Sequence, residues 1–239
     1  MSVNRAIPSV PQADGTLGVL PSRTGAYGEA YVLPLGADQA VFAEEGSMYV
    51  QLSTTPGTGI AGHAAPVAAD LSTKPVIHLF NGGTKNIIPR WIKCRITTAG
   101  AGGTNVNLES WIETGGGATS KASGGTVVSP ATNCLGGAAA PASGAVTTFG
   151  AVVSTLTSAK RQNHFQVRAT IEIVEDIYWV VFGQPNSSVI GPVVATLNNY
   201  CIPFAPVCVL PGQNFQFNHW GASHSGASSY DLQLCYTER

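Results

Sequence analysis

Short runs of alternating apolar and polar residues, separated by turns, dominate the chain from about residue 27 onward. Alternation with a period of two predicts β-strands that bury one face. Gly, Pro and Asn recur between the runs and predict tight turns. The expected strands cover Tyr27–Leu35, Ala40–Ala43, Ser47–Thr54, Val76–Phe80, Ile87–Thr98, Asn105–Ile112, Phe149–Leu156, Phe165–Ile173, Ile177–Phe182, Val189–Leu197, Ile202–Leu210, Asn214–Asn218 and Tyr230–Tyr236. This pattern predicts an all-β protein, a single antiparallel β-sandwich of jelly-roll type.

Three stretches carry more specific expectations. Ile87–Thr98 and Asn105–Ile112 are separated by a short glycine-rich turn, which predicts that they pair as an antiparallel hairpin. Phe165–Ile173 alternates over nine positions and is the clearest half-buried strand of the sequence. The segment 115–145 is almost entirely Gly, Ala, Ser and Thr, so we expect a long loop with one short strand near Thr126–Ser129.

The N-terminal residues 1–25 form a different kind of segment. They are rich in Pro, Gly and small polar residues, and no apolar period is sustained. We therefore expect an extended N-terminal arm at 1–25, followed by the jelly-roll domain at 26–239. The arm either docks on a partner or frays, as chain ends commonly do.

Composition excludes several classes of protein. Charged residues make up 10% of the chain and the net charge is −1, against about 25% charged residues in typical domains. A disordered chain has a high net charge, and a nucleic-acid-binding protein has a basic balance, so neither is expected. No long apolar run that would span a membrane occurs, and the N-terminus lacks the apolar run of a signal peptide. Five cysteines, an odd number, predict reduced thiols in a protein made in the cytoplasm.

The span between Asp176 and Asp231 contains no Asp, Glu, Lys or Arg. Soluble monomers usually expose mixed charges, and interface cores are depleted in them. The span is therefore either surface that a partner covers or a neutral surface rich in Ser, Thr and Asn.

Motifs that would carry catalysis or cofactor binding are weak. Gly57–Gly62 matches GxGxxG, but Pro66 soon interrupts any following helix and no acidic residue follows at the spacing of a nucleotide site. His219 and His224 lie close together without a nearby third ligand, so we expect polar loop histidines and no metal site. We expect no cofactor.

Carboxylates and tryptophans leave two further possibilities. The acidic residues occur as Glu44 with Glu45, Glu109 with Glu113, and Glu172 with Glu175 and Asp176. A glycosidase needs two carboxylates across a cleft, whereas solvated charges on turns and strand faces are commoner, so we expect no enzyme. The four tryptophans form either part of the core or an exposed sugar-binding face; they are Trp91, Trp111, Trp179 and Trp220.

Three segments resemble a known family: Pro21–Leu35 (PSRTGAYGEAYVLPL), Ala61–Gly83 (AGHAAPVAADLSTKPVIHLFNGG) and Val209–Arg239 (VLPGQNFQFNHWGASHSGASSYDLQLCYTER). They are similar to the jelly-roll decoration, or cement, proteins on the heads of short-tailed bacteriophages. The resemblance implies a virion protein that assembles as a homodimer or homotrimer on the outer capsid surface. It also implies that the protein clamps neighbouring major capsid proteins and has no catalytic residues.

Within that interpretation, specific residues receive roles. Arg5 and Arg23 are the expected capsid contacts of the arm, while Trp220, Tyr230 and Tyr236 are expected at an oligomer interface. The alternative is a receptor- or glycan-binding module of a head fibre or tail, which would expose an aromatic platform.

Overall fold

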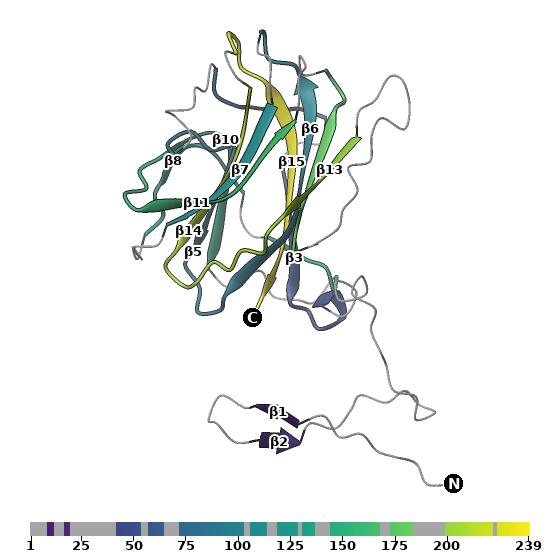
Figure 1. Cartoon of the computed structure of the whole chain (residues 1–239), viewed down its shortest axis with the longest axis vertical. Helices are drawn as coiled ribbons and strands as arrows, with labels where there is room; N and C mark the ends of the chain where they lie inside the picture. The colour runs from purple at the N-terminus through teal and green to yellow at the C-terminus, as the bar shows by residue number, and fades with distance from the viewer. Residues whose placement is uncertain are drawn as a thin grey trace, which may run out of the picture. The chain divides into compact units, whose positions relative to one another are not determined.

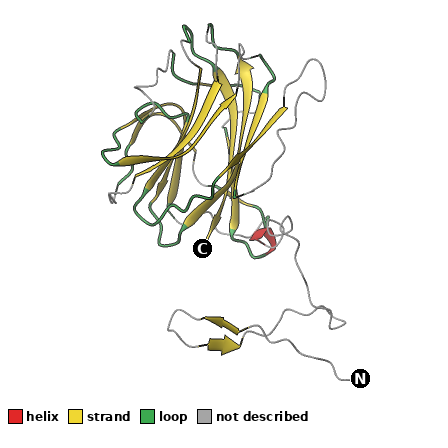
Figure 2. Ribbon diagram, viewed as in Figure 1, coloured by secondary structure: helices red, strands yellow, loops and turns green. Residues whose placement is uncertain are grey.

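A computed structural model describes 9–11, 17–19, 42–53, 57–64, 72–102, 106–113, 119–128, 131–136, 144–167, 173–183, 199–221 and 224–239. The chain divides into two compact units, Met1–Val41 and Phe42–Arg239. In the first unit, β1 (Ser9–Pro11) pairs antiparallel with β2 (Leu17–Val19). The strand expected at Tyr27–Leu35 lies outside the described residues, and residues 42–44 form a helical turn where a strand was expected (Figure 2).

The second unit is a sandwich of two sheets (Figure 1). Its strands are β3 (Met48–Leu52), β4 (Ile60–Ala61), β5 (Ile77–Asn81), β6 (Ile87–Thr98), β7 (Val106–Glu113), β8 (Ala122–Val128), β9 (Thr132–Asn133), β10 (Ala145–Ser154), β11 (Ala159–Val167), β12 (Ile177–Phe182), β13 (Asn199–Phe204), β14 (Asn214–Gly221) and β15 (Ser229–Glu238). One sheet has the order β11-β7-β14-β5-β10-β8. The other has the order β13-β12-β6-β15-β3-β9, with β4 added beside β15.

Eight of these strands follow the jelly-roll order. In the larger sheet they run β3-β15-β6-β12, and in the smaller sheet β5-β14-β7-β11. Successive strands of the eight alternate between the sheets, except that β7 and β11 pair within the smaller sheet, as two interlocked Greek keys require. All pairings among the eight are antiparallel. The expected fold class is therefore confirmed, and β8, β9, β10 and β13 extend the sheets beyond the jelly roll.

The core lies between the sheets and follows the alternation of the strands. On β6, Ile92, Cys94 and Ile96 are fully buried, whereas Trp91 and Lys93 on the opposite face are half-buried. Aromatic side chains from the charge-free span fill much of the space, among them Phe182, Phe204, Phe215 and Phe217. This part of the span is therefore used inside the chain's own core.

One local expectation was wrong, and a second was right only in part. β6 and β7 do not form a hairpin, because they belong to opposite sheets and the connection between them crosses the sandwich. β6 instead pairs with β12 and β15, which are distant in sequence. The strand expected at Phe165–Ile173 begins earlier, at Ala159, since β11 pairs with β7 from Ala159 to Val167. Ile173 lies in a turn and is half-exposed.

The described residues of the glycine-rich segment 115–145 contain more strand than expected. It contributes β8 and β9, one at an edge of each sheet. β8 is mostly exposed, and Gly124 and Gly125 adopt positive φ where its register with β10 shifts. Such a bulge interrupts a sheet edge and discourages pairing with another chain.

Candidate functional site

The outer face of the larger sheet combines aromatic, apolar and charged side chains on a regular surface. Pairing registers place one row of residues side by side across five strands. This cross-strand row consists of Leu52, Gln233, Lys93, Trp179 and Cys201. Gln233, Lys93, Trp179 and Cys201 are half-buried, and Leu52 is 47% exposed.

Two of the four tryptophans meet on this face. The ring centroids of Trp91 on β6 and Trp179 on β12 are 5.4 Å apart, with the planes inclined by 61°. The Lys93 ammonium lies 5.2 Å from the Trp179 ring centroid, a cation–π contact. Trp91 also packs against the buried cluster formed by Phe42, Met48 and Cys235. The two rings together form an angled, partly exposed aromatic surface.

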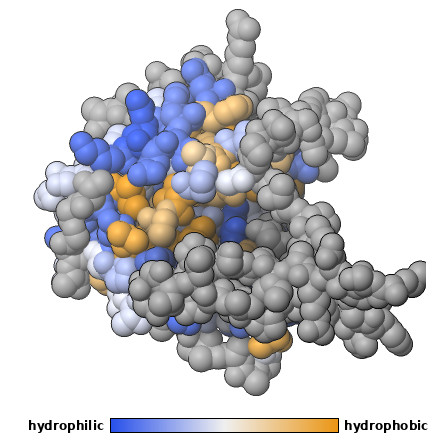
Figure 3. All heavy atoms as spheres, turned by 60° about the horizontal axis from the view of Figure 1, so that its bottom comes forward, coloured by the Kyte–Doolittle hydropathy of each residue, from blue (hydrophilic) through white to orange (hydrophobic). Residues whose placement is uncertain are grey.

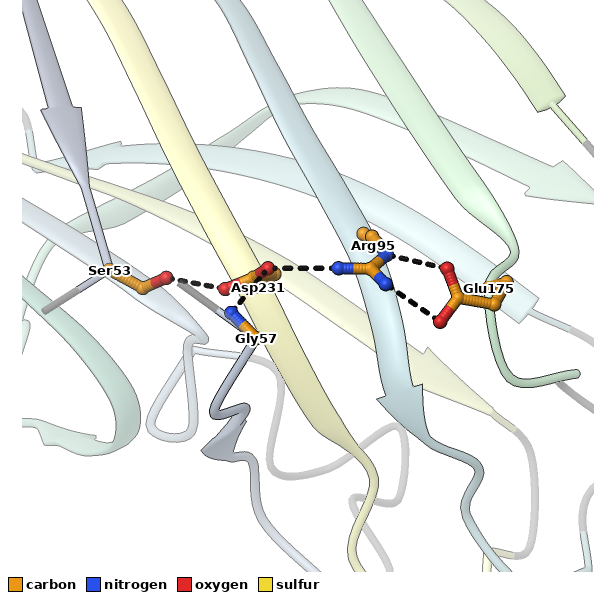
Figure 4. A network of polar contacts seen from close by, with 5 residues as sticks. All are labelled: Ser53, Gly57, Arg95, Glu175 and Asp231. Carbon is orange, nitrogen blue, oxygen red and sulfur yellow. Dashed lines mark hydrogen bonds and ion pairs between the residues drawn. The ribbon is translucent and has the colours of Figure 1, made fainter. Parts of the chain in front are cut away.

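Beside the row lies a network of charged and polar groups (Figure 4). Arg95 donates from Nε and Nη2 to the two carboxylate oxygens of Glu175, both at 2.7 Å, and from Nη1 to Asp231 at 3.2 Å. Asp231 also accepts from Ser53 Oγ at 2.9 Å and from the Gly57 backbone N–H at 3.3 Å. The hydrogen bonds from Arg95 hold the pKa of Glu175 below its ordinary value. The network fixes the charges at this end of the face.

At the other end of the same face, Phe42 is clamped by two guanidinium groups. Arg90 lies 4.4 Å and Arg239 lies 4.1 Å from the centroid of its ring, and Phe42 is 7% exposed. The backbone of Arg239 is itself paired with Asn86 in both directions. Phe42 is the first residue of the sandwich unit, so these contacts hold the start of that unit against its own sheet.

The outer face of the smaller sheet is polar but buried, which the sequence did not indicate. Glu109 accepts from Trp111 Nε1 at 3.0 Å and from Arg161 Nη1 at 3.2 Å. Glu113 accepts from Asn214 Nδ2 at 2.8 Å. Both glutamates were expected to be solvated, and both are buried. Donors from the protein therefore hold both carboxylates in place within the fold.

Loops cover this polar face, and amide side chains of β14 attach them through hydrogen bonds. Gln216 donates from Nε2 to the Ser72 carbonyl at 3.1 Å, and Asn214 Oδ1 accepts from the Lys121 backbone N–H at 3.1 Å. His78 on β5 lies directly opposite Gln216. It is fully buried and has no hydrogen-bond partner at either ring nitrogen within the described residues. Burial lowers the pKa of His78 to about 4. Alternating polar residues in β7 and β14 were the available signal, but alternation alone does not show that loops cover them.

Two of the residues expected at an oligomer interface lie in the core. Tyr236 is fully buried and stacks on Tyr49 at 5.7 Å, and Tyr230 is 3% exposed and packs against His219 at 5.0 Å. The expectation is therefore wrong for Tyr230 and Tyr236, because their rings fill the sandwich of their own chain. Trp220 is half-buried at the end of β14, and its interface role stays a prediction. Arg5 and Arg23 lie outside the described residues.

The remaining motifs are part of the fold. Gly57–Gly62 contains β4, and its described residues form no helix. His219, expected in a loop, lies on β14 in the core beside Tyr178. His224 is also buried, and Gly100 and Gly221 leave room for its ring. In the described ranges, no three His, Cys, Asp or Glu side chains gather where they would hold a metal ion.

Comparisons with known proteins do not add an identity. No family model, no curated protein and no solved structure matches the chain. Among the described residues, no helix is both long enough and apolar enough to cross a membrane.

Proposed function

We propose that this chain is a structural protein of a bacteriophage virion, a decoration protein that binds the outer capsid surface. The observation that carries the proposal is its construction from two units, Met1–Val41 and the jelly-roll unit Phe42–Arg239. Two attachment units in one chain suit a protein that bridges neighbouring major capsid proteins. The resemblance of Pro21–Leu35 and Val209–Arg239 to cement proteins supports the same role.

The physical advantage of such a design is multivalency. A first contact raises the effective concentration of the second unit near its own site, so modest contacts add to a stable attachment. A protein that binds only the assembled shell shifts the equilibrium toward the assembled state. The shell therefore gains stability without any catalytic step.

The first test is the copy number of the protein in purified virus particles, measured by quantitative mass spectrometry against the major capsid protein. A decoration protein is present in hundreds of copies at a fixed ratio to the shell subunit. A few dozen copies would instead indicate a fibre or tail module, and absence from particles would overturn the virion role.

A second test addresses the arm. Deleting residues 2–24 should leave the thermal unfolding of the sandwich unchanged and weaken binding to capsids that lack the protein. Capsid binding at the wild-type level would show that the arm takes no part in attachment. Size-exclusion chromatography with light scattering on the same samples tests the proposed homodimer or homotrimer.

A further inference from the structure

The structure points to a second activity beyond capsid attachment. We propose that the outer face of the larger sheet binds a glycan, with a pyranose ring on Trp179 and its hydroxyl groups at Lys93 and Gln233. Lys93 lies directly opposite Trp179 on one side and Gln233 on the other. The three side chains therefore stand next to one another on three adjacent strands.

The aromatic part of this site has the required electronic character. The face of an aromatic ring is electron-rich and attracts groups with a partial positive charge. The Lys93 ammonium, 5.2 Å from the Trp179 centroid, already makes such a contact. The C–H groups on one face of a pyranose carry partial positive charge and suit the same ring. Trp91, inclined by 61° to Trp179, provides a wall beside it.

The polar part of the site is available for hydroxyl groups. Lys93 and Gln233 are half-buried, and their side chains make no hydrogen bond within the described part of the chain. Lys93 supplies donors only, whereas the Gln233 amide supplies both a donor and an acceptor. Sugar hydroxyls can use all of these groups. Neighbouring side chains on one sheet face lie about 5 Å apart, which is close to the width of one sugar ring.

The surroundings favour a glycan over a protein partner on this row. The core of a protein interface is depleted in charge. Here the next row along the strands holds the ion pairs of Arg95 with Glu175 and Asp231, which are fixed and partly solvated. Figure 3 shows one face of the molecule, on which hydrophobic residues gather in a limited area beside strongly hydrophilic ones. A small aromatic area framed by polar groups fits a ligand that is apolar on one face and polar at its rim.

The test uses saturation-transfer NMR and tryptophan fluorescence on the full-length chain. The probes are maltohexaose, cellohexaose, chitohexaose and micelles of lipopolysaccharide carrying O-antigen, each at millimolar sugar concentration. We expect at least one probe to bind, with saturation transferred to its ring protons. No binding by any of the four would overturn the proposal.

Substitutions locate the site. Trp179→Ala and Gln233→Ala should each weaken binding about tenfold, and Trp179→Phe should retain much of it. Leu210→Ala, which alters an exposed apolar residue outside the row, serves as the control. Binding that survives both Trp179→Ala and Gln233→Ala in correctly folded protein would refute this site. Capsid binding by Trp179→Ala should be unchanged, which separates this proposal from the decoration role.

Discussion

Arg95 and Glu175 form a bidentate ion pair, with both N–O distances at 2.7 Å. The pair connects β6 to the turn that precedes β12, and Glu175 holds a φ of +78°, the one positive value among the described non-glycine residues. A left-handed backbone is unfavourable for glutamate. The residue that pairs with Arg95 therefore holds a backbone conformation that costs free energy. The same guanidinium reaches Asp231 on β15.

Asp231 is the centre of this network, and its removal should destabilise the sandwich. It accepts hydrogen bonds from Arg95, Ser53 and the Gly57 backbone. We expect Asp231→Ala to lower the free energy of unfolding by about 2 kcal/mol, since hydrogen bonds to a charged group are lost together. Urea denaturation measures the change. Glu44→Ala, an exposed carboxylate, should stay within about 0.5 kcal/mol of wild type, and equal effects of both substitutions would contradict the network's role.

Gly221 has to be glycine because of its neighbour His224. A Cβ built on Gly221 would lie 2.0 Å from His224 Nε2, and one on Gly100 would lie 2.8 Å from His224 Nδ1. Gly221→Ala should therefore lower the free energy of unfolding by about 2 kcal/mol or more, because the ring or the backbone has to shift.

The control for Gly221→Ala comes from the same end of the sandwich. At Gly226 the nearest atom to an added Cβ is Ala101 Cβ at 3.2 Å, so Gly226→Ala should have a much smaller effect. Thermal unfolding of the two variants provides the comparison. A stable Gly221→Ala protein would show that His224 moves freely.

Phe42 should stabilise the folded protein through the contacts of its aromatic ring as well as through burial of its apolar surface. Phe42→Leu keeps a buried apolar side chain but removes the contacts with Arg90 and Arg239. We expect a loss of about 1–2 kcal/mol in the free energy of unfolding. Leu52→Ala, on the exposed side of β3, should change it by less than about 0.5 kcal/mol. If Phe42→Leu and Leu52→Ala changed the free energy of unfolding equally in urea denaturation, the two cation–π contacts would not contribute to stability.

The sequence located most strands but not their partners. Alternation over Ile87–Thr98 and Ile177–Phe182 matches β6 and β12 residue for residue, because side-chain periodicity is a local property. Pairing is not local, so the pattern predicted a hairpin of β6 with β7 that the jelly-roll topology does not contain. The contact between Trp91 and Trp179 depends on the pairing of β6 with β12, which is not local either. The composition showed that tryptophans were present, but it did not show which of them meet.

Burial was the other property that the sequence did not reveal. The motif around Glu109 and Glu113 alternates as a half-solvated strand would, and the same holds for Gln216 on β14. These side chains are buried because loops lie over the outer face of the smaller sheet. A period-two pattern reports which residues share a face, and it does not report what covers that face.

His78 should make the stability of the protein depend on pH. Its pKa is lowered to about 4 in the folded state, from an ordinary value of 6.5, because the ring is buried. As pH falls below 6.5 the unfolded state takes up a proton that the folded state does not, so stability is lost until about pH 4. The shift corresponds to a loss of about 3 kcal/mol in the free energy of unfolding.

Substitution separates this titration from general instability. His78→Leu should flatten the pH dependence between pH 4 and 6.5, the range set by the two pKa values, because nothing at that position titrates. Leu79→Ala, a fully buried neighbour on β5, should lower stability at every pH while retaining the wild-type slope, because His78 is still present. Urea denaturation across this pH range gives both slopes. A His78→Leu protein with the wild-type slope would show that acid acts through other groups, and that the loops keep the ring less isolated from water than its burial indicates.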